Sequence, residues 1–111
     1  MVARDRQKCL SLFYFRRIYM LKGKVTIQEQ EVSGNYKFVG IPMYMTKGFQ
    51  ETFGEETNAV AFTAHMLLLE KYPNDADYFQ VFLYSYPDGK EVKFWLINDV
   101  SHMTFLLPSE Y

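Results

Sequence analysis

Apolar residues recur at helical spacing between residues 56 and 71, and this pattern predicts an α-helix that ends before Pro73. One stripe of the helix consists of Val60, Ala64, Leu67 and Leu68. Phe62, Met66 and Leu69 lie on nearly the opposite side of the same helix. A helix that is apolar on both sides is either buried on both or exposes an apolar patch.

Two runs of strand-favouring residues, 78–86 and 90–98, flank Pro87-Asp88-Gly89. Proline presets φ and glycine accepts positive φ, so this tripeptide predicts a tight turn between two antiparallel strands. A third strand is expected over residues 102–107, which Pro108 ends. A half-buried strand alternates apolar and polar residues, whereas the first two runs carry apolar side chains on both faces.

The first half of the chain gives weaker strand signals. Residues 24–32 alternate only as far as Ile27, and residues 36–46 form a β-favouring run that is interrupted by Pro42. Ser33-Gly34-Asn35 between them is a turn signal, so we expect a β-hairpin here. Residues 47–57 are polar, contain two glycines and predict a loop.

The predicted elements therefore follow one another as a hairpin, a helix and a β-meander. This order predicts an α+β fold in which one main helix packs on a small antiparallel sheet. A chain of 111 residues has the usual length of one domain, which we expect to span residues 20–111.

Residues 1–19 form a basic extension around the short apolar stretch LSLFYF. This stretch is shorter than the core of a secretory signal, and no small-residue cleavage site follows it. Three interpretations stay open: an extra edge strand, sequence upstream of a natural start at Met20, or a basic arm for membranes or nucleic acid.

The charge pattern restricts the partner class. The net charge is -1, with eight basic and three acidic residues in 1–40 but four basic and ten acidic residues in 41–111. Such a balance disfavours general binding of phosphate backbones, and no apolar run is long enough to cross a membrane. Cys9 is the only cysteine, so a reducing, cytoplasmic compartment is expected.

Signals for catalysis or cofactor binding are weak. The glycines match no phosphate-binding loop, and we expect no cofactor and no metal. His65 and His102 lack metal-ligand spacing, so an enzyme that uses this pair is only an alternative. We expect His65 to be a satisfied or surface side chain, and we expect no enzymatic activity.

A second alternative is a binder of single-stranded nucleic acid that stacks bases on one strand face. Its aromatic platform would consist of Tyr78, Phe82, Tyr84 and Tyr86. Cations usually flank such platforms, whereas here Lys90 and Lys93 stand among four acidic residues. The sequence therefore favours a protein partner over nucleic acid.

The segments YMTKGFQE, residues 44–51, and DYFQVFLY, residues 77–84, stand on either side of the predicted helix. With this spacing, residues 41–111 resemble the uncharacterised family called domain of unknown function nine-sixty, from Gram-positive bacteria and their mobile elements. The resemblance implies a small α+β domain in a cytoplasmic setting and no catalytic residues. It also implies that the residues before Met20 are dispensable.

The helix and the strands both carry more apolar surface than one helix–sheet interface covers. We predict that the surplus is a protein interface made of Phe62, Met66, Leu69, Tyr78, Phe82 and Tyr84. On the strand, the opposite set of Phe79, Val81 and Leu83 stays open as the alternative, and so does coverage of both surfaces by residues 1–46. The predicted function is a non-enzymatic protein-interaction module from a mobile element or a host accessory set, with a homodimer as the simplest assembly.

Overall fold

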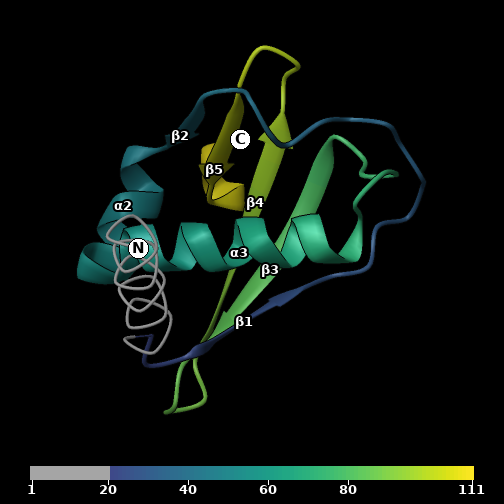
Figure 1. Cartoon of the computed structure of the whole chain (residues 1–111). Coiled ribbons are helices and arrows are strands. Elements are labelled where there is room, and N and C mark those ends of the chain that lie inside the picture. The colour runs from purple at the N-terminus through teal and green to yellow at the C-terminus, as the bar shows by residue number, and fades with distance from the viewer. Residues whose placement is uncertain (1–20) are drawn as a thin grey trace, which may run out of the picture.

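The computed structural model describes residues 21–111; the extension predicted over residues 1–19 lies outside this part. Within it, two helices lie against one face of a five-stranded sheet (Figure 1). The elements in chain order are β1 (Lys24–Ile27), β2 (Met43–Met45), α2 (Lys47–Phe53), the 3-10 turn η1 (Gly54–Glu56), α3 (Thr57–Lys71), β3 (Phe79–Ser85), β4 (Glu91–Asn98), β5 (Met103–Leu106) and the 3-10 turn η2 (Pro108–Glu110). The α+β prediction, with one main helix on a mostly antiparallel sheet, is confirmed.

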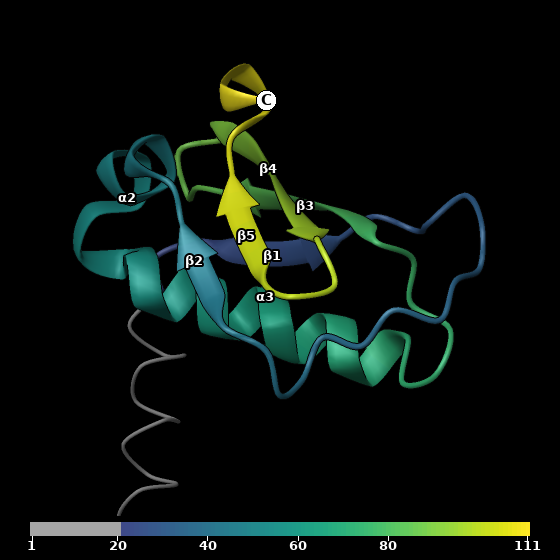
Figure 2. The same ribbon diagram turned by 90° about the horizontal axis from the view of Figure 1, so that it is seen from above.

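The strands follow the order β1-β3-β4-β5-β2 across the sheet (Figure 2). The predicted pair β3–β4 is confirmed, with Phe79 opposite Ile97 at one end and Ser85 opposite Glu91 at the other. Gly89 has a φ of 93° in the turn between them, which is the conformation that the sequence required. The predicted third strand is β5, and it pairs antiparallel with β4.

The predicted hairpin between residues 24–32 and 36–46 is wrong. β1 pairs antiparallel with β3 at one edge of the sheet, and β2 pairs parallel with β5 at the other edge. Gly34 does not turn the chain back on itself, because its N–H donates to the carbonyl of Asp75 at 3.0 Å. A Cβ at Gly34 would lie 2.7 Å from the carbonyl oxygen of Ala76, so the chain crosses the end of the domain at a point where only glycine fits.

The predicted loop over residues 47–57 is also wrong, because it contains helix α2 and the turn η1. The Thr46 hydroxyl caps α2 by accepting a hydrogen bond from the N–H of Phe49 at 3.2 Å. The same hydroxyl donates to Glu110 Oε1 at 2.6 Å, and Glu110 Oε2 accepts from the N–H of Gly48 at 3.0 Å. The C-terminal turn η2 therefore fixes the start of α2. The sequence of α2 is mostly polar, but its two phenylalanines, Phe49 and Phe53, are buried.

The core lies between the helices and the sheet face that we call the inner face. α3 contributes the stripe that the sequence predicted, since Val60, Ala64 and Leu68 are fully buried. The sheet and α2 contribute an aromatic cluster in which Phe49 lies 5.4 Å from Phe94 and 5.3 Å from Phe105, ring centre to ring centre. The fully buried sheet residues of this core are Phe82, Tyr84, Phe94, Leu96 and Phe105.

Candidate interaction surface on the outer face of the sheet

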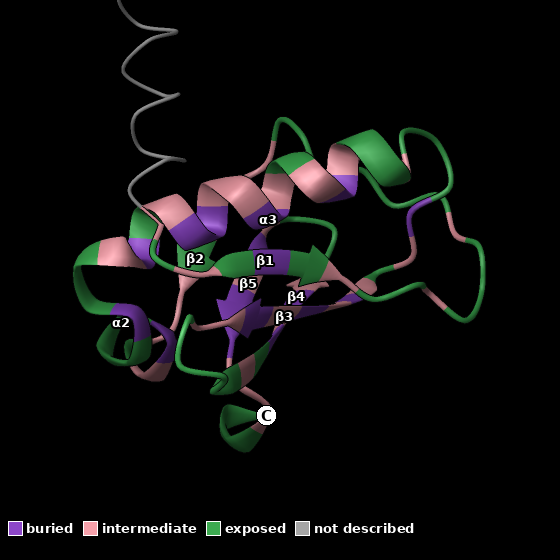
Figure 3. Cartoon of the chain, turned by 90° about the horizontal axis from the view of Figure 1, so that it is seen from below, coloured by how far each residue is buried: buried purple, intermediate pink, exposed green. Residues whose placement is uncertain are grey.

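The face of the sheet opposite the helices, which we call the outer face, is covered by no α-helix of residues 21–111, although the C-terminal turn η2 packs against part of β4 there. Figure 3 shows α3 on one side of the sheet and the short C-terminal turn on the other. The apolar residues of the outer face are Phe79, Val81 and Leu83 of β3, Trp95 and Ile97 of β4, and Leu106 of β5. None of them belongs to the core cluster that the helices cover, so the sheet has a second apolar face. Leu106 is only 7% exposed on this face, and the other five side chains are half-buried.

Polarity changes along the outer face in cross-strand rows, because residues in register lie side by side. The row nearest the β3–β4 turn is polar and consists of Lys24, Ser85 and Glu91. The next row consists of Thr26, Leu83 and Lys93. The two remaining rows centre on Val81 beside Trp95 and on Phe79 beside Ile97. The apolar surface therefore occupies the half of the face that is far from this turn.

At that apolar end, two buried polar residues face inward while apolar residues face outward. Gln80 is 1% exposed, and its Nε2 donates to Gln30 Oε1 at 2.8 Å and to the carbonyl of Asp77 at 3.0 Å. Asn98 is 4% exposed, and its Nδ2 donates to the carbonyl of Lys37 at 2.7 Å. The loop between β1 and β2 brings polar groups to the inner face here, and the apolar neighbours Phe79, Trp95 and Ile97 lie on the outer face, where each is half-buried.

Aromatic rings gather on and around the apolar end of the outer face. Trp95 lies 4.8 Å from Phe79 and 5.7 Å from Tyr111, between ring centres. At the margin, Tyr78 is 45% exposed and contacts Tyr36, with their rings 5.8 Å apart. Trp and Tyr in such clusters are the side chains that protein interfaces favour.

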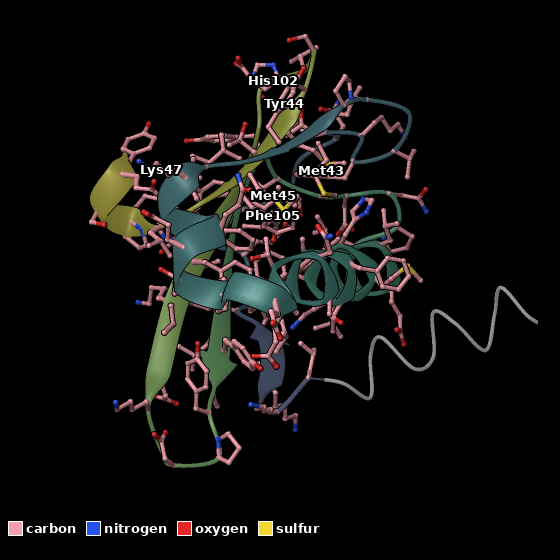
Figure 4. The ribbon with its side chains drawn as sticks, turned by 90° about the vertical axis from the view of Figure 1, so that its left-hand side faces the viewer. Met43, Tyr44, Met45, Lys47, His102 and Phe105 are labelled. Atoms are coloured by element: carbon pink, nitrogen blue, oxygen red, sulfur yellow. The ribbon has the colours of Figure 1, made fainter. Side chains whose placement is uncertain are left out.

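The edge strand β2 extends this surface with one more aromatic side chain. Tyr44 is 55% exposed and lies beside His102, with the ring centres 5.5 Å apart (Figure 4). Met43 and Met45 on either side of it point the other way and pack against the core. In register, Tyr44 is opposite Thr104 of β5, in the same row as Phe79 and Ile97.

The structure separates the predicted strand residues from one another. Tyr78 is on the surface, but Phe82 and Tyr84 have no exposed surface, so their placement in an interface is wrong. Both pack in the core, where Phe82 stacks on Phe94 at 5.2 Å and the Tyr84 hydroxyl donates to Glu56 Oε1 at 3.0 Å. Burial raises the pKa of the Tyr84 phenol. The alternative set of Phe79, Val81 and Leu83 lies on the outer face instead.

The predicted stacking platform for nucleic acid needed the same two buried side chains. Phe82 and Tyr84 offer no ring face to a base, because both are fully buried. Tyr86 is half-buried, packs against the core and lies 4.7 Å from Tyr84. The platform is therefore not formed on the surface of the protein.

The predicted helix residues of α3 also differ from one another. Met66 is 48% exposed, opposite the buried stripe. Leu69 is half-buried and packs against the core, and Phe62 is half-buried. Only Met66 of these three is a freely exposed apolar side chain.

The two histidines make separate structural contacts. His65 Nε2 lies 2.6 Å from the carbonyl oxygen of Phe38. This side chain therefore connects α3 to the loop between β1 and β2, residues 28–42, which we call the crossing loop. His102 Nδ1 lies 3.0 Å from Ser101 Oγ, and its Nε2 lies 3.7 Å from Asp99 Oδ2. Within residues 21–111 no cluster of three or more His, Cys, Asp and Glu side chains is arranged to hold a metal ion. The described histidines thus give no geometric support to the enzyme alternative.

Trp95, Ile97 and Leu106 are outer-face residues that the sequence pattern did not lead us to predict. A signal was present, because Glu91 and Lys93 alternate with Val92 and Phe94 and so mark the outward parity of the strand. Trp95 and Ile97 have that same parity. Ser85 pairs with Glu91 across the turn, so it also points outward. Alternation along β3 then places Leu83, Val81 and Phe79 on the same outer face.

Comparisons with family models, curated proteins and solved structures found no match for this chain. The resemblance of residues 41–111 to domain of unknown function nine-sixty therefore stays a prediction. None of the helices in residues 21–111 has the length and apolar character needed to cross a membrane.

Proposed function

We propose that this protein is a non-enzymatic interaction module that binds a protein partner through the outer face of its sheet. The observation that carries the proposal is the apolar end of this face, where Trp95, Phe79 and Ile97 are turned away from the core. Apolar patches with a polar margin are typical of binding sites on small domains. The lone cysteine is compatible with a cytoplasmic setting for this module.

The apolar end of the outer face differs in composition from an ordinary solvent-facing sheet. Antiparallel sheets with one solvated face carry polar side chains there, as the row of Lys24, Ser85 and Glu91 does. Burial of apolar surface contributes roughly 25 cal/mol per Å². A partner that covered Val81, Trp95 and their neighbours would gain this term at little polar desolvation cost.

The proposal is tested with a matched pair of valine substitutions in the full chain. Val81 lies in the centre of the outer face, and Val39 is 56% exposed in the loop between β1 and β2. We expect Val81→Lys to abolish binding of the protein partner, whether a second copy or another protein, and Val39→Lys to leave it unchanged. Light scattering measures self-association, and affinity capture from the native host followed by mass spectrometry measures other partners.

Circular dichroism establishes that both variants keep the fold, and Val81→Thr supplies a milder variant if the lysine unfolds the chain. Partner binding that is equal in the wild type and in both Val81 variants would contradict the proposal. So would a wild-type chain that neither self-associates nor captures a partner.

A further inference from the structure

The polar end of the outer face carries one base and one acid on opposite sides of β3. Lys24 of β1 and Glu91 of β4 both flank Ser85 in register. Both side chains are exposed, and within residues 21–111 neither forms an ion pair. The Glu91 carboxylate accepts only a long hydrogen bond, 3.4 Å, from Ser85 Oγ. These two charges stand one strand away from β3 on either side.

Consider two copies of the chain whose outer faces meet, related by a two-fold axis that runs parallel to β3 between them. With this axis the charges of one copy are complementary to those of the other. Such an axis places each row on the same row of a second copy and exchanges β1 with β4. Lys24 then faces Glu91 of the second copy, and Glu91 faces the second copy's Lys24. An axis along β4 would instead place Glu91 on Glu91 and Lys93 on Lys93, which like-charge repulsion disfavours.

The same axis brings the apolar end of β4 over a hollow of about 340 Å³ at the edge of β3. The hollow opens where β1 ends at Ile27 and leaves β3, and its lining combines Phe79 and Val81 with polar side chains that include Gln28 and Glu29. Because β4 of the second copy would lie over the continuation of β1, its Trp95 and Ile97 would project toward this hollow. Sheets that pack face to face interdigitate side chains in this way.

We infer that the occupant of the outer face is a second copy of this chain, docked face to face about a two-fold axis along β3. The inference rests on the proposed function and adds the identity of the partner and its orientation. The apolar rows supply the contact area, and the two Lys24–Glu91 pairs set the direction. A dimer of this kind is closed, because each copy uses the same surface.

The test exchanges the two charges in the full chain. In a dimer of Lys24→Glu, residue 24 faces Glu91 twice, and in a dimer of Glu91→Lys, residue 91 faces Lys24 twice. We expect each single variant to dimerise about tenfold more weakly than the wild type at low salt. An equimolar mixture of the two variants restores both attractive pairs, so it should form a heterodimer near wild-type affinity, as should the homodimer of the double variant.

Sedimentation equilibrium gives the dissociation constants, and native mass spectrometry separates the heterodimer from the two homodimers. Trp95 is the only tryptophan of the chain, so its fluorescence reports on the outer face alone. We expect its emission to move to shorter wavelength, and its quenching by acrylamide to fall, over the concentration range in which the dimer forms. Val81→Lys should remove both the dimer and this fluorescence change.

The alternative outcomes overturn the inference in distinguishable ways. A wild-type monomer that captures another protein in a Val81-dependent manner refutes the second copy but leaves the proposed function standing. A monomer whose Trp95 is fully shielded from acrylamide at all concentrations means that the chain itself covers the outer face, and this result refutes both. A dimer that forms with Val81→Lys uses another surface, and a dimer without rescue in the mixture has another axis.

Discussion

Strand β4 places Phe94 on the inner face of the sheet and its neighbour Trp95 on the outer face. Phe94 has no exposed surface and lies among Phe49, Phe53 and Phe82, with ring centres 5.2 to 5.5 Å away. Trp95 is half-buried, and within residues 21–111 its ring contacts are those with Phe79 and Tyr111, at comparable distances. Two adjacent aromatic residues therefore lie on opposite faces of the sheet with different degrees of burial.

The difference teaches that apolar character alone does not identify the core of this protein. The inner face includes two polar residues, Gln80 and Asn98, whose amides bind the crossing loop. The outer face is apolar at the same end of the sheet, yet it contributes nothing to the core cluster. We therefore expect stability to depend mainly on the inner face and partner binding to depend on the outer face.

The largest expected effect comes from the adjacent pair on β4. Phe94→Ala should lower the free energy of unfolding by about 3–5 kcal/mol, because it removes the centre of a packed aromatic cluster. Trp95→Ala should cost about 1 kcal/mol in the monomer, the scale of its aromatic contacts. Urea unfolding at low protein concentration measures both, and equal losses would show that the outer face is part of the core.

The crossing loop that closes the end of the inner face gives the next largest effect. We expect Gly34→Ala to cost about 3 kcal/mol, since its Cβ would meet backbone atoms of Ala76 and Asp77 at 2.7 and 2.8 Å. Ser33→Ala is the matched control, because Ser33 is exposed, and should change stability by less than about 0.5 kcal/mol. Thermal melts of the two variants measure these stability changes. An unchanged melting temperature for Gly34→Ala would mean that the loop packs less closely than the structure shows.

Asn98 of the inner face should contribute to the free energy of unfolding, although asparagine is usually found on protein surfaces. Asn98→Ala removes the hydrogen bond to the Lys37 carbonyl and the one that Asn98 Oδ1 accepts from the N–H of Val100 at 2.8 Å. We expect a loss of about 2 kcal/mol from these unmade bonds. Denaturant unfolding checks this value. A loss no larger than that of the exposed neighbour variant Asp99→Ala would show that the loop holds without this amide.

The smallest effect concerns Glu110, which joins η2 to the start of α2. Hydrogen bonds from the Thr46 hydroxyl and then from the N–H groups of Leu107 and Gly48 lower the pKa of its carboxyl. A lowered pKa stabilises the fold above the ordinary carboxyl value, and this contribution is lost as the pH falls through the lowered value. Glu110→Gln should therefore be less stable than the wild type at neutral pH, with a difference that shrinks in acid. A pH series of melts tests this, and a constant difference would contradict it.

The sequence by itself determined the elements that have local signals. Helix α3 follows from its periodicity and from Pro73, and the β3–β4 pair follows from the turn chemistry at Pro87-Asp88-Gly89. The charged residues Glu91 and Lys93 also indicate which alternate positions of β4 point outward, and Trp95 is one of these positions. These features depend on residues close in sequence, whose geometry the backbone fixes directly.

Only the tertiary structure decided where β1 and β2 pair and that residues 47–53 fold as α2. Both strands are short, and each pairs with a strand from the second half of the chain rather than with the other. α2 is polar along most of its length, and its two phenylalanines become buried only against Phe94 and Phe105. Long-range pairing is a competition among all available edges, which no local pattern encodes. For the same reason the choice of the inner face, with Phe82 and Tyr84 in the core, came from the helices that cover it.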